Sequence, residues 1–468
     1  MNVIVIGAGP TGLATAMLLA GQGHHITVLE RDPDGPSSTG LEAWQSWERP
    51  GVSQFRLPHV MMPRALALLR QELPEVVAEL ETAGARRHNM IAGTWDLPAL
   101  GGRLPEDHRY ETMAARRPVL EFALATVAAR TPGITIRRGQ TIARLVTGRA
   151  PLPDVPHITG VETRNGEVLH ADLIVDASGR NSQIPKILAE LGPILDTEER
   201  AAAGFIYYAR HYRDNGNGLP EATHWPLTHQ ETITAGTLPG DNGTWSLILV
   251  ASSRDHELRA LRDASAWDRA IELFPEYAHW ARHGEPLTDV QVMSAGQTRR
   301  RDLVADGLPV VTGLLALGDA WATTNTTFGL GLSMGLTQGA LLRDAIDAQD
   351  HIKLSLAFAQ ALETTAAPYY RALRDWDAHR LAEIDSNISG EQYETADPAW
   401  QIIRALDAAK LSHPDLVRAY AQVGSMLEPA EHVLARPGLI DLIMTLGAEA
   451  SRYPTPGLFR RELLTAIG

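Results

Sequence analysis

Three glycines near the N-terminus have the spacing of a phosphate-binding turn. Gly7, Gly9 and Gly12 form the pattern G-x-G-x-x-G. Gly7 permits a tight turn, Gly9 lets the backbone approach a pyrophosphate, and Gly12 lets a helix pack closely on a strand. Glu30, about 18 residues after Gly12, is placed to accept hydrogen bonds from an adenosine ribose. These residue types at this spacing indicate the binding of a dinucleotide.

Two strands and one helix must position these residues. Residues 2–6 are uncharged and mostly β-branched, as expected of a parallel strand buried on both faces. Residues 13–20 are rich in alanine and leucine and predict a helix, whose unpaired N–H groups and positive dipole end would face the diphosphate. Residues 25–29 predict a second strand that ends at Glu30. The alternative is an ordinary βαβ unit with a glycine turn and a solvated Glu30.

The composition excludes several kinds of chemistry. The chain of 468 residues has no cysteine, which rules out disulfides, thiolate nucleophiles, cysteine-ligated zinc and a flavin linked through cysteine. Lysine occurs only at Lys186, Lys353 and Lys410. The acidic residues and histidines show no spacing typical of metal ligands, so we expect no metal site. The net charge of −14 argues against nucleic acid as a partner.

The sequence also bears on location and size. No run approaches about 18 consecutive apolar residues, so we predict no membrane span. The N-terminus begins directly with a buried strand and has no basic segment ahead of it, which argues against a signal peptide. We therefore expect a cytoplasmic protein. Its length is sufficient for two or three domains with a large core.

The order of the predicted elements indicates an α/β protein with an insertion. Apolar strands of the buried parallel type are predicted over 172–176 and 309–317, and aromatic-rich strands between them indicate an inserted α+β domain at about 195–300. A long irregular stretch that contains Arg49 and Gln54 follows Glu30, and loops of this length are often functional. The other predicted elements are helices over 63–84, 119–130, 329–348 and 354–380, a strand over 134–136, two or three strands within 141–170, strands over 205–212, 231–237 and 244–251, and mostly helix after 380.

Three segments far apart in sequence share the character of a nucleotide-binding turn. The strand ends at 7–12, 176–179 and 318–319 each join an apolar strand to small residues. Open α/β sheets bind ligands at the carboxyl ends of their strands, so one extended cofactor could contact all three. Over residues 1–380 this pattern resembles the FAD-dependent monooxygenases of the p-hydroxybenzoate hydroxylase fold.

The resemblance implies an α/β fold with three regions. A Rossmann-like FAD-binding domain of the GR2 type would span residues 1–194 together with 301–380. A substrate-binding domain with an antiparallel sheet would span 195–300, and a helical region would span 381–468. Two roles are open for the C-terminal helices, covering the active site or forming the contact of a homodimer.

The resemblance also implies which residues bind FAD. The first fingerprint would bind the ADP half, and Arg117, in an R-x-x-L pattern that opens a helix, would contact the diphosphate. Asp319, in a G-D motif, would contact the ribitol chain. The glycines at 329 and 331 would direct N–H groups at the flavin N1–C2=O edge and stabilise the charge of reduced flavin. The full predicted set is Gly7, Gly9, Pro10, Thr11, Gly12, Glu30, Arg31, Gln54, Arg117, Asp176, Gly179, Gly318, Asp319, Gly329, Gly331 and Leu332.

The sequence departs from the family pattern at two places. The usual proline shortly before Gly329 is replaced, because residues 325–327 are Asn-Thr-Thr. The middle motif usually carries Asp-Gly, and this chain has Ser178-Gly179. That variant resembles related epoxidases, halogenases and prenyl reductases, several of which take electrons from other proteins. The predicted electron source is therefore either NAD(P)H or a separate flavin reductase.

The expected chemistry is that of the cofactor. Reduced flavin reacts with dioxygen at C4a to give a hydroperoxide, and the protein must hold the ring, exclude water and direct the peroxide at a substrate. The candidate catalytic residues are His59, His224 and Trp321, although a loop or strand histidine is more often only hydrogen-bonded. The aromatic candidates for a substrate pocket, each of which has core packing as the alternative, are Tyr207, Tyr208, Tyr212, Trp225, Trp245, Trp321 and Phe328.

Three functions compete on this basis. The first is a monooxygenase that hydroxylates or epoxidises a small aromatic or polycyclic molecule of the secondary-metabolite kind. The second is an FAD-dependent reductase or dehydrogenase on the same fold, and the third is a flavin-binding protein without catalysis. A flavin halogenase is disfavoured, because the W-x-W-x-I-P motif of that class is missing: Trp44 and Trp47 are spaced differently and are followed by Glu-Arg-Pro.

Overall fold

The fold is taken from a computed structural model that describes residues 1–192, 197–201, 204–294, 296–346, 350–450, 453 and 459–468. The predicted domain boundary at 194/195 lies outside the described residues, as does part of the predicted C-terminal helical region. In the described part of the chain, every helix is too short or too polar to cross a membrane.

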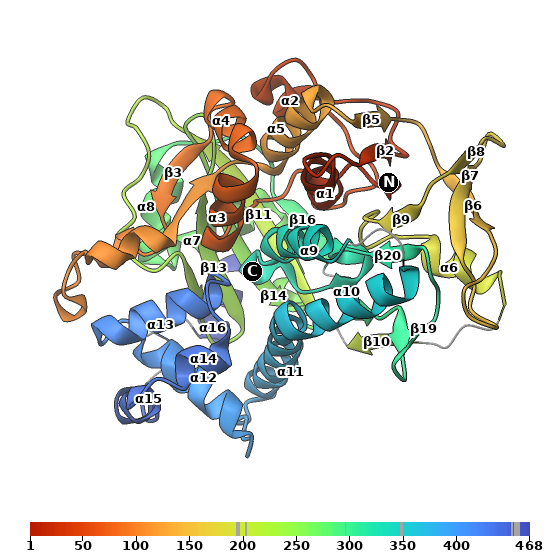
Figure 1. Ribbon diagram of the computed structural model, residues 1–468. Coiled ribbons are helices and arrows are strands. Elements are labelled where there is room, and N and C mark those ends of the chain that lie inside the picture. Colours follow the sequence, from red (N-terminus) through yellow and green to blue (C-terminus); the bar gives the residue numbers. More distant parts are fainter. Residues whose placement is uncertain (193–196, 202–203, 295, 347–349, 451–452, 454–458) are drawn as a thin grey trace.

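A parallel sheet of five strands forms the centre of the nucleotide-binding region (Figure 1). Ile6 lies opposite both Leu29 and Asp176, and Asp176 lies opposite Ala316, so the strands end at one sheet edge. This arrangement confirms the predicted parallel strands and their common edge. In spatial order the strands are β20 (Leu314–Ala316), β9 (Leu173–Asp176), β1 (Asn2–Ile6), β2 (His25–Leu29) and β5 (Ile134–Arg137).

Helices cover one face of this sheet and a small antiparallel sheet covers the other. Helix α1 (Pro10–Ala20) packs between α5 (Arg117–Arg130) and α9 (Gly331–Ala345). On the opposite face, the side chains of Ile4 and Ile174 contact a hydrophobic cluster that includes Val161. Much of this cluster comes from the three-stranded sheet formed by β6 (Ile142–Thr147), β7 (Ile158–Thr163) and β8 (Val168–His170).

The inserted region is built on a six-stranded antiparallel sheet (Figure 1). Alternate residues of its central strand point to opposite faces, so Tyr208 and Tyr212 pack in one core with Trp267, and Tyr207 packs on the other side with Trp376. The strands are β11 (Phe205–Arg213), β12 (Leu227–His229), β13 (Ile233–Pro239), β14 (Thr244–Ser252), β15 (Glu285–Pro286) and β16 (Gln291–Ser294), and the helices against the first face are α7 (Ala264–Glu272), α8 (Pro275–His283) and α16 (Arg460–Ile467).

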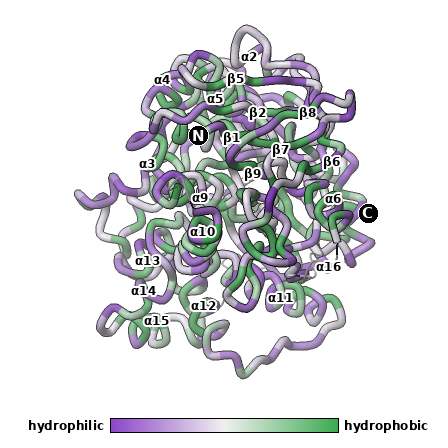
Figure 2. Tube along the Cα trace, turned by 45° about the vertical axis from the view of Figure 1, so that its right-hand side comes forward, coloured by the Kyte–Doolittle hydropathy of each residue, from purple (hydrophilic) through white to green (hydrophobic). Residues whose placement is uncertain are grey.

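The C-terminal helices lie together below α9 in both views (Figures 1 and 2). They are α12 (Pro398–Ala409), α13 (Pro414–Gly424), α14 (Ala430–Leu434) and α15 (Leu439–Gly447). The remaining elements are α2 (Gly40–Ser46), α3 (Pro63–Glu72), α4 (Pro74–Thr82), β3 (Arg86–Asn89), β4 (Glu111–Ala114), α6 (Ile184–Ala189), β10 (Glu198–Ala201), β17 (Thr298–Arg301), β18 (Val304–Ala305), β19 (Leu308–Pro309), β21 (Ala322–Thr323), α10 (His351–Thr365) and α11 (Ala367–Ser389).

Proline and glycine account for the predicted elements that are wrong. The helix predicted over 63–84 is two helices, because Pro74 disfavours helical backbone at Leu73, whose φ and ψ are −138° and 57°. The helix predicted over 354–380 is likewise divided at Ala366, two residues before Pro368. The strand predicted over 309–317 is only Leu314–Ala316 in the parallel sheet, preceded by a glycine in the left-handed region.

Candidate functional site

One cavity opens at the edge where the parallel strands end. Its wall includes Gly7, Gly9, Gly179, Gly318 and Asp319, so the three predicted turns meet in one place. The cavity then continues between the inserted antiparallel sheet, helix α11 and the C-terminal helices. The described structure thus joins a glycine-rich end and a larger aromatic end in a single space.

The first turn has the shape that its glycines predict. Gly7 has a φ of +104°, and a Cβ there would lie 2.6 Å from the carbonyl oxygen of Ala177. A Cβ on Gly12 would lie 2.1 Å from the carbonyl oxygen of Gly7, which shows how closely α1 packs on the turn. A Cβ on Gly9 would meet no protein atom within 4 Å, because Gly9 faces the cavity. This open cradle of backbone fits a diphosphate.

Two helices begin at the cavity without a side-chain cap. Gly9 precedes α1 and Leu330 precedes α9, and neither residue has a side-chain atom that could accept a hydrogen bond from its helix. The first N–H groups of each helix therefore remain available to an anionic or carbonyl oxygen. Before α9, Gly329 has a φ of +65°, and the Asn325 side chain accepts the Thr327 N–H, so an asparagine-capped turn stands where the family has proline.

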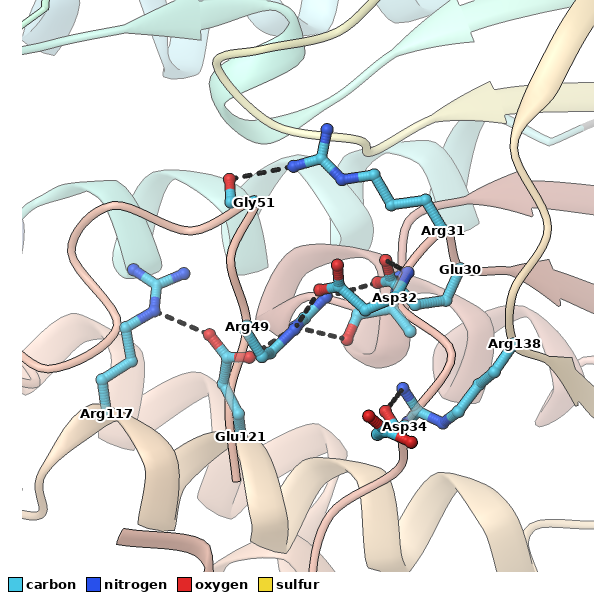
Figure 3. A network of polar contacts seen from close by, with 10 residues as sticks. Glu30, Arg31, Asp32, Asp34, Arg49, Gly51, Arg117, Glu121 and Arg138 are labelled. Carbon is cyan, nitrogen blue, oxygen red and sulfur yellow. Dashed lines mark hydrogen bonds and ion pairs between the residues drawn. The ribbon is translucent and has the colours of Figure 1, made fainter. Parts of the chain in front are cut away.

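A network of buried charges lies beside the first turn (Figure 3). The Arg49 guanidinium pairs with Glu30, donates to Asp32 Oδ2 at 3.1 Å, and contacts Glu121 Oε2 at 2.5 Å. Arg117 donates from Nε to the other oxygen of Glu121 at 2.6 Å. Burial acts to raise the pKa of Glu121, but the charges of Arg117 and Arg49 outweigh it and lower the pKa below its usual value. The network joins the second strand, the following loop and α5.

Comparison with known proteins agrees with this geometry. The family model for FAD dependent oxidoreductases matches residues 2–88. The chain superposes on PqsL, a probable FAD-dependent monooxygenase from Pseudomonas aeruginosa, with a TM-score of 0.61 and 16% identity over 82% of this chain and 97% of that one. The N-terminal region thus matches FAD dependent oxidoreductases, and the chain as a whole has the p-hydroxybenzoate hydroxylase fold.

Two relatives are similar to this chain over most of its length. Protein Rv3254 of Mycobacterium tuberculosis is 26% identical over 428 residues, which cover 85% of this chain and 82% of the relative. A D-amino acid dehydrogenase of Methylobacterium nodulans is 27% identical over 443 residues, which cover 74% of this chain and 95% of the relative. The similarity to these relatives therefore extends well beyond residues 2–88, which the family model matches.

Most of the predicted FAD-binding residues line the cavity. The predicted residues on its wall are Gly7, Gly9, Pro10, Thr11, Gln54, Arg117, Gly179, Gly318, Asp319, Gly329, Gly331 and Leu332. Across the turns, Arg180 Nε lies 3.6 Å from Asp319 Oδ2, which links the second and third segments. These groups supply backbone N–H donors, one carboxylate and two guanidiniums, a donor set that fits the diphosphate and ribitol of FAD.

Four predicted residues lie off the cavity wall. Gly12 is in the packed start of α1, and Asp176 is buried with its carboxylate accepting from Ser178 and Ser182, so Asp176 holds the second turn in shape. Glu30 is buried and accepts the Ala8 N–H at 2.9 Å in addition to its pair with Arg49. Arg31 is exposed and donates to the Gly51 carbonyl oxygen at 2.9 Å. A ribose contact by Glu30 stays a prediction.

Two of the three candidate catalytic residues lie at the cavity and the third does not. His59 and His224 line the cavity. Burial lowers the pKa of His59 to about 3, aided by the charge of Arg117, so His59 is neutral near pH 7. Trp321 is in the core, where its indole N–H donates to Asp302 at 3.2 Å, and this position gives no support for its predicted catalytic role.

The aromatic end of the cavity is only partly the predicted one. Tyr207, Trp225 and Phe328 line it, whereas Tyr208, Tyr212 and Trp245 are core residues behind the antiparallel sheet. Sequence reasoning missed further lining residues from β3 and the C-terminal half, because no local motif marks them. Those residues include His88, Trp280, Tyr369, Trp376, Leu406 and Tyr420.

A buried carboxylate stands behind the cavity wall. Asp377, on α11, accepts a hydrogen bond from Asn325 Nδ2 at 2.7 Å. Asn325 Oδ1 in turn accepts from the Tyr207 hydroxyl, and Tyr207 and Asn325 both line the cavity. Burial raises the pKa of Asp377 to about 7, although Asn325 and Thr298 act to lower it. Asp377 thereby fixes which way the Asn325 amide faces.

We expect Asp377→Asn to change how stability depends on pH. The folded protein binds the Asp377 proton more tightly than the unfolded chain, so the free energy of unfolding of the wild type should fall, relative to the variant, as pH rises from about 4 to about 7. A shift of this size corresponds to up to about 4 kcal/mol in total. Urea unfolding of both proteins between pH 5 and 8 measures the difference. A constant difference across this range would contradict the assignment.

Proposed function

We propose that this protein is an FAD-dependent monooxygenase that hydroxylates or epoxidises an aromatic or polycyclic molecule. The observation that carries the proposal is the single cavity in which a diphosphate-binding turn and an aromatic compartment are continuous. The description of PqsL as a probable FAD-dependent monooxygenase supports it. When bound, FAD would supply the activation of dioxygen, which the protein's own side chains cannot perform.

The residues of the cavity have distinct roles in this proposal. The N–H groups at the start of α1 and the Arg117 guanidinium bind the diphosphate, and Asp319 binds the ribitol chain. The start of α9 directs N–H groups at the isoalloxazine ring and stabilises the negative charge it acquires on reduction. Phe328 and Tyr207 bound the adjoining space, where a substrate would lie.

The C-terminal helices exclude water from the substrate compartment. Ile402, Ile403 and Leu406 of α12 and Tyr420 of α13 form part of the cavity wall. Exclusion of water protects a reactive oxygen species from wasteful decay. Of the two roles that the sequence left open for these helices, their position on the cavity wall favours covering the active site.

The source of electrons divides the proposal into two forms. NAD(P)H could reduce the flavin on this chain, or a separate flavin reductase could supply reduced flavin. Serine at position 178, where the family pattern has aspartate, favours the separate reductase. Dioxygen is the second substrate in either form.

A dehydrogenase or reductase on the same fold is the second candidate. Similarity to a D-amino acid dehydrogenase over 74% of this chain favours it. The two candidates differ in what happens when reduced enzyme meets dioxygen. A monooxygenase holds an oxygen adduct and transfers oxygen to substrate, whereas a dehydrogenase avoids or does not use oxygen.

Stopped-flow spectroscopy distinguishes the candidates. The purified flavoprotein is reduced by NADPH, with and without a flavin reductase, and then mixed with air-saturated buffer. A transient absorption band that differs from those of oxidised and reduced flavin is expected for the monooxygenase. Direct return to oxidised flavin, with release of hydrogen peroxide whatever the substrate, would favour the dehydrogenase.

The Asp319→Ala variant tests the cofactor assignment separately. Loss of a hydrogen bond to a charged group costs about 1.5–3 kcal/mol, which corresponds to about 10- to 150-fold weaker FAD binding. Titration of the apoprotein with FAD, followed by flavin fluorescence, measures the change. Asp344→Ala is the control, because Asp344 is an exposed carboxylate on α9 beside Arg343. Equal affinity in the Asp319 variant and this control would refute the assignment.

A further inference from the structure

The end of the cavity distant from the glycine turns is apolar. We call it the distal compartment and define it by Met90, Trp225, Leu238, Ile403, Leu406 and Tyr420. The rings of Trp225 and Tyr420 meet edge to face, with centroids 5.2 Å apart, and join the loop before β12 to α13. A hydrophobic cluster that includes Ile91 and Val417 packs behind these side chains. The compartment is therefore lined by packed aromatic and aliphatic groups.

Charged side chains are confined to the other end of the cavity. Among the described residues that line it, the only arginine, lysine, aspartate or glutamate residues are Arg117, Arg180 and Asp319. All three belong to the segments that carry the predicted FAD contacts. An ionised carboxylate placed in the distal compartment would lose its hydration without gaining a charged partner, which is costly. The compartment thus disfavours an anionic ligand.

Two histidines bring polar atoms to the same wall. His88, on β3, and His224, in the loop before β12, both line the cavity. The turn that follows β3 packs closely on the loop of His224, since a Cβ on Gly93 would lie 2.6 Å from the His224 carbonyl oxygen. In the described structure, His88 Nδ1 and His224 Nε2 are buried and have no hydrogen-bond partner. Buried polar atoms of native proteins are usually paired, so these two atoms require a partner that the described residues do not provide.

The surroundings keep both imidazoles neutral near pH 7. Burial lowers the pKa of His88 to about 4, and Arg86 acts on it both through its backbone, which raises the pKa, and through its charge, which lowers it. Burial and, to a lesser extent, the charge of His279 lower the pKa of His224 to about 4. A neutral imidazole can donate or accept one hydrogen bond at each ring nitrogen, but it does not neutralise a carboxylate. Hydroxyl, carbonyl and amide groups are its matching partners.

We infer that the distal compartment binds an uncharged ring compound whose neutral polar groups are hydrogen-bonded by His88 and His224. The inference rests on the proposed function only in treating this compartment as the substrate end of the cavity. The substrate class that it names is a neutral aromatic or polycyclic molecule. Carboxylic acids of the same size are excluded from this class.

Three matched probes test the inference on the FAD-loaded protein without reductant. 2-Naphthamide, 2-naphthoate and naphthalene share one ring system and differ in polarity and charge. Binding at pH 7.5 is followed by perturbation of the flavin spectrum and by quenching of tryptophan fluorescence. We expect 2-naphthamide to bind at least about tenfold more tightly than 2-naphthoate. Equal or tighter binding of the carboxylate, or failure of 2-naphthamide to bind at its solubility limit, would overturn the inference.

Histidine variants locate the contact. Removal of one neutral hydrogen bond costs about 0.5–1.5 kcal/mol, so His224→Phe should weaken 2-naphthamide about 2- to 12-fold and leave naphthalene unchanged. His88→Phe should act in the same direction. The control is His279→Phe, because the His279 ring lies 6.1 Å from that of His224 and is not on the cavity wall. Unchanged 2-naphthamide affinity in both test variants would overturn the histidine assignment.

The result of the probe-binding test does not depend on whether the protein is a monooxygenase. The binding measurement needs neither reduction nor dioxygen. A protein that prefers 2-naphthamide but returns directly to oxidised flavin in air would refute the monooxygenase and retain this inference. A protein that forms the oxygen-dependent transient but prefers 2-naphthoate would do the reverse.

Discussion

Arg49→Ala is expected to lower the free energy of unfolding by about 3–5 kcal/mol, because it leaves buried carboxylates without their counter-charge. Arg49 contacts Glu30, Asp32 and Glu121, and its side chain is 4% exposed. Arg117 reaches only Glu121, so Glu30 and Asp32 would lose their shared cation. The loss would also disturb the turn, since Glu30 accepts the Ala8 N–H.

Urea unfolding at pH 7.5 measures this change against a matched surface pair. Arg282 pairs with Glu272, and their side chains are 64% and 47% exposed, so Arg282→Ala should cost no more than about 1 kcal/mol. Arg49→Lys is a second comparison, because an ammonium keeps the charge but cannot make three separate contacts with planar geometry. A loss for Arg49→Ala as small as that for Arg282→Ala would show that the buried network contributes little to stability.

Alanine substitutions at two glycines of the fingerprint should affect different properties, FAD affinity in one case and fold stability in the other. Gly9→Ala should fold normally, because the added Cβ meets no protein atom within 4 Å, but it should weaken FAD binding at least about tenfold by blocking the approach of the diphosphate. Gly12→Ala should destabilise the fold by about 1–3 kcal/mol or more, because its Cβ would lie 2.1 Å from the Gly7 carbonyl oxygen.

Thermal unfolding of the apoprotein and FAD titration, performed on the same preparations, separate the two effects. Gly21→Ala is the control at the other end of α1, where the nearest atom to an added Cβ lies at 3.4 Å. It should alter neither the melting temperature of the apoprotein by more than a few degrees nor the FAD affinity. Full FAD affinity in Gly9→Ala would mean that the diphosphate does not approach this turn.

The parallel sheet could be predicted because each of its strands is marked by neighbouring residues in the sequence. Residues 2–6 carry no charge and are followed at once by the glycine pattern, and residues 173–176 repeat the buried character before a second turn. Carboxyl ends of parallel strands meet by topology, so the convergence of three turns followed without knowledge of any distant contact. The breaks in the helices at Pro74 and Pro368 were equally visible in the sequence, but helical periodicity on both sides obscured them.

The rest of the site depends on contacts between residues far apart in the chain. Arg49 and Glu121 are 72 positions apart, and neither the loop nor the helix carries a motif that pairs them. The distal compartment draws on β3, on the loop before β12 and on α13, which meet only through tertiary packing. Acidic residues at 30 and 32, which follow a buried strand, were the one available signal that a cation must lie nearby.

Helices α1 and α9 meet at two glycines, and this contact sets a length scale in the molecule. A Cβ on Gly335 would lie 2.1 Å from Thr11 Oγ1, and one on Gly339 would lie 2.7 Å from Thr15 Oγ1, so the two threonine side chains of α1 lie directly against the backbone of α9. Such a joint has little freedom to slide, and the starts of the two helices stay at a constant separation. Under the proposed cofactor assignment, this fixed separation sets the distance between the diphosphate site at the start of α1 and the flavin-ring site at the start of α9.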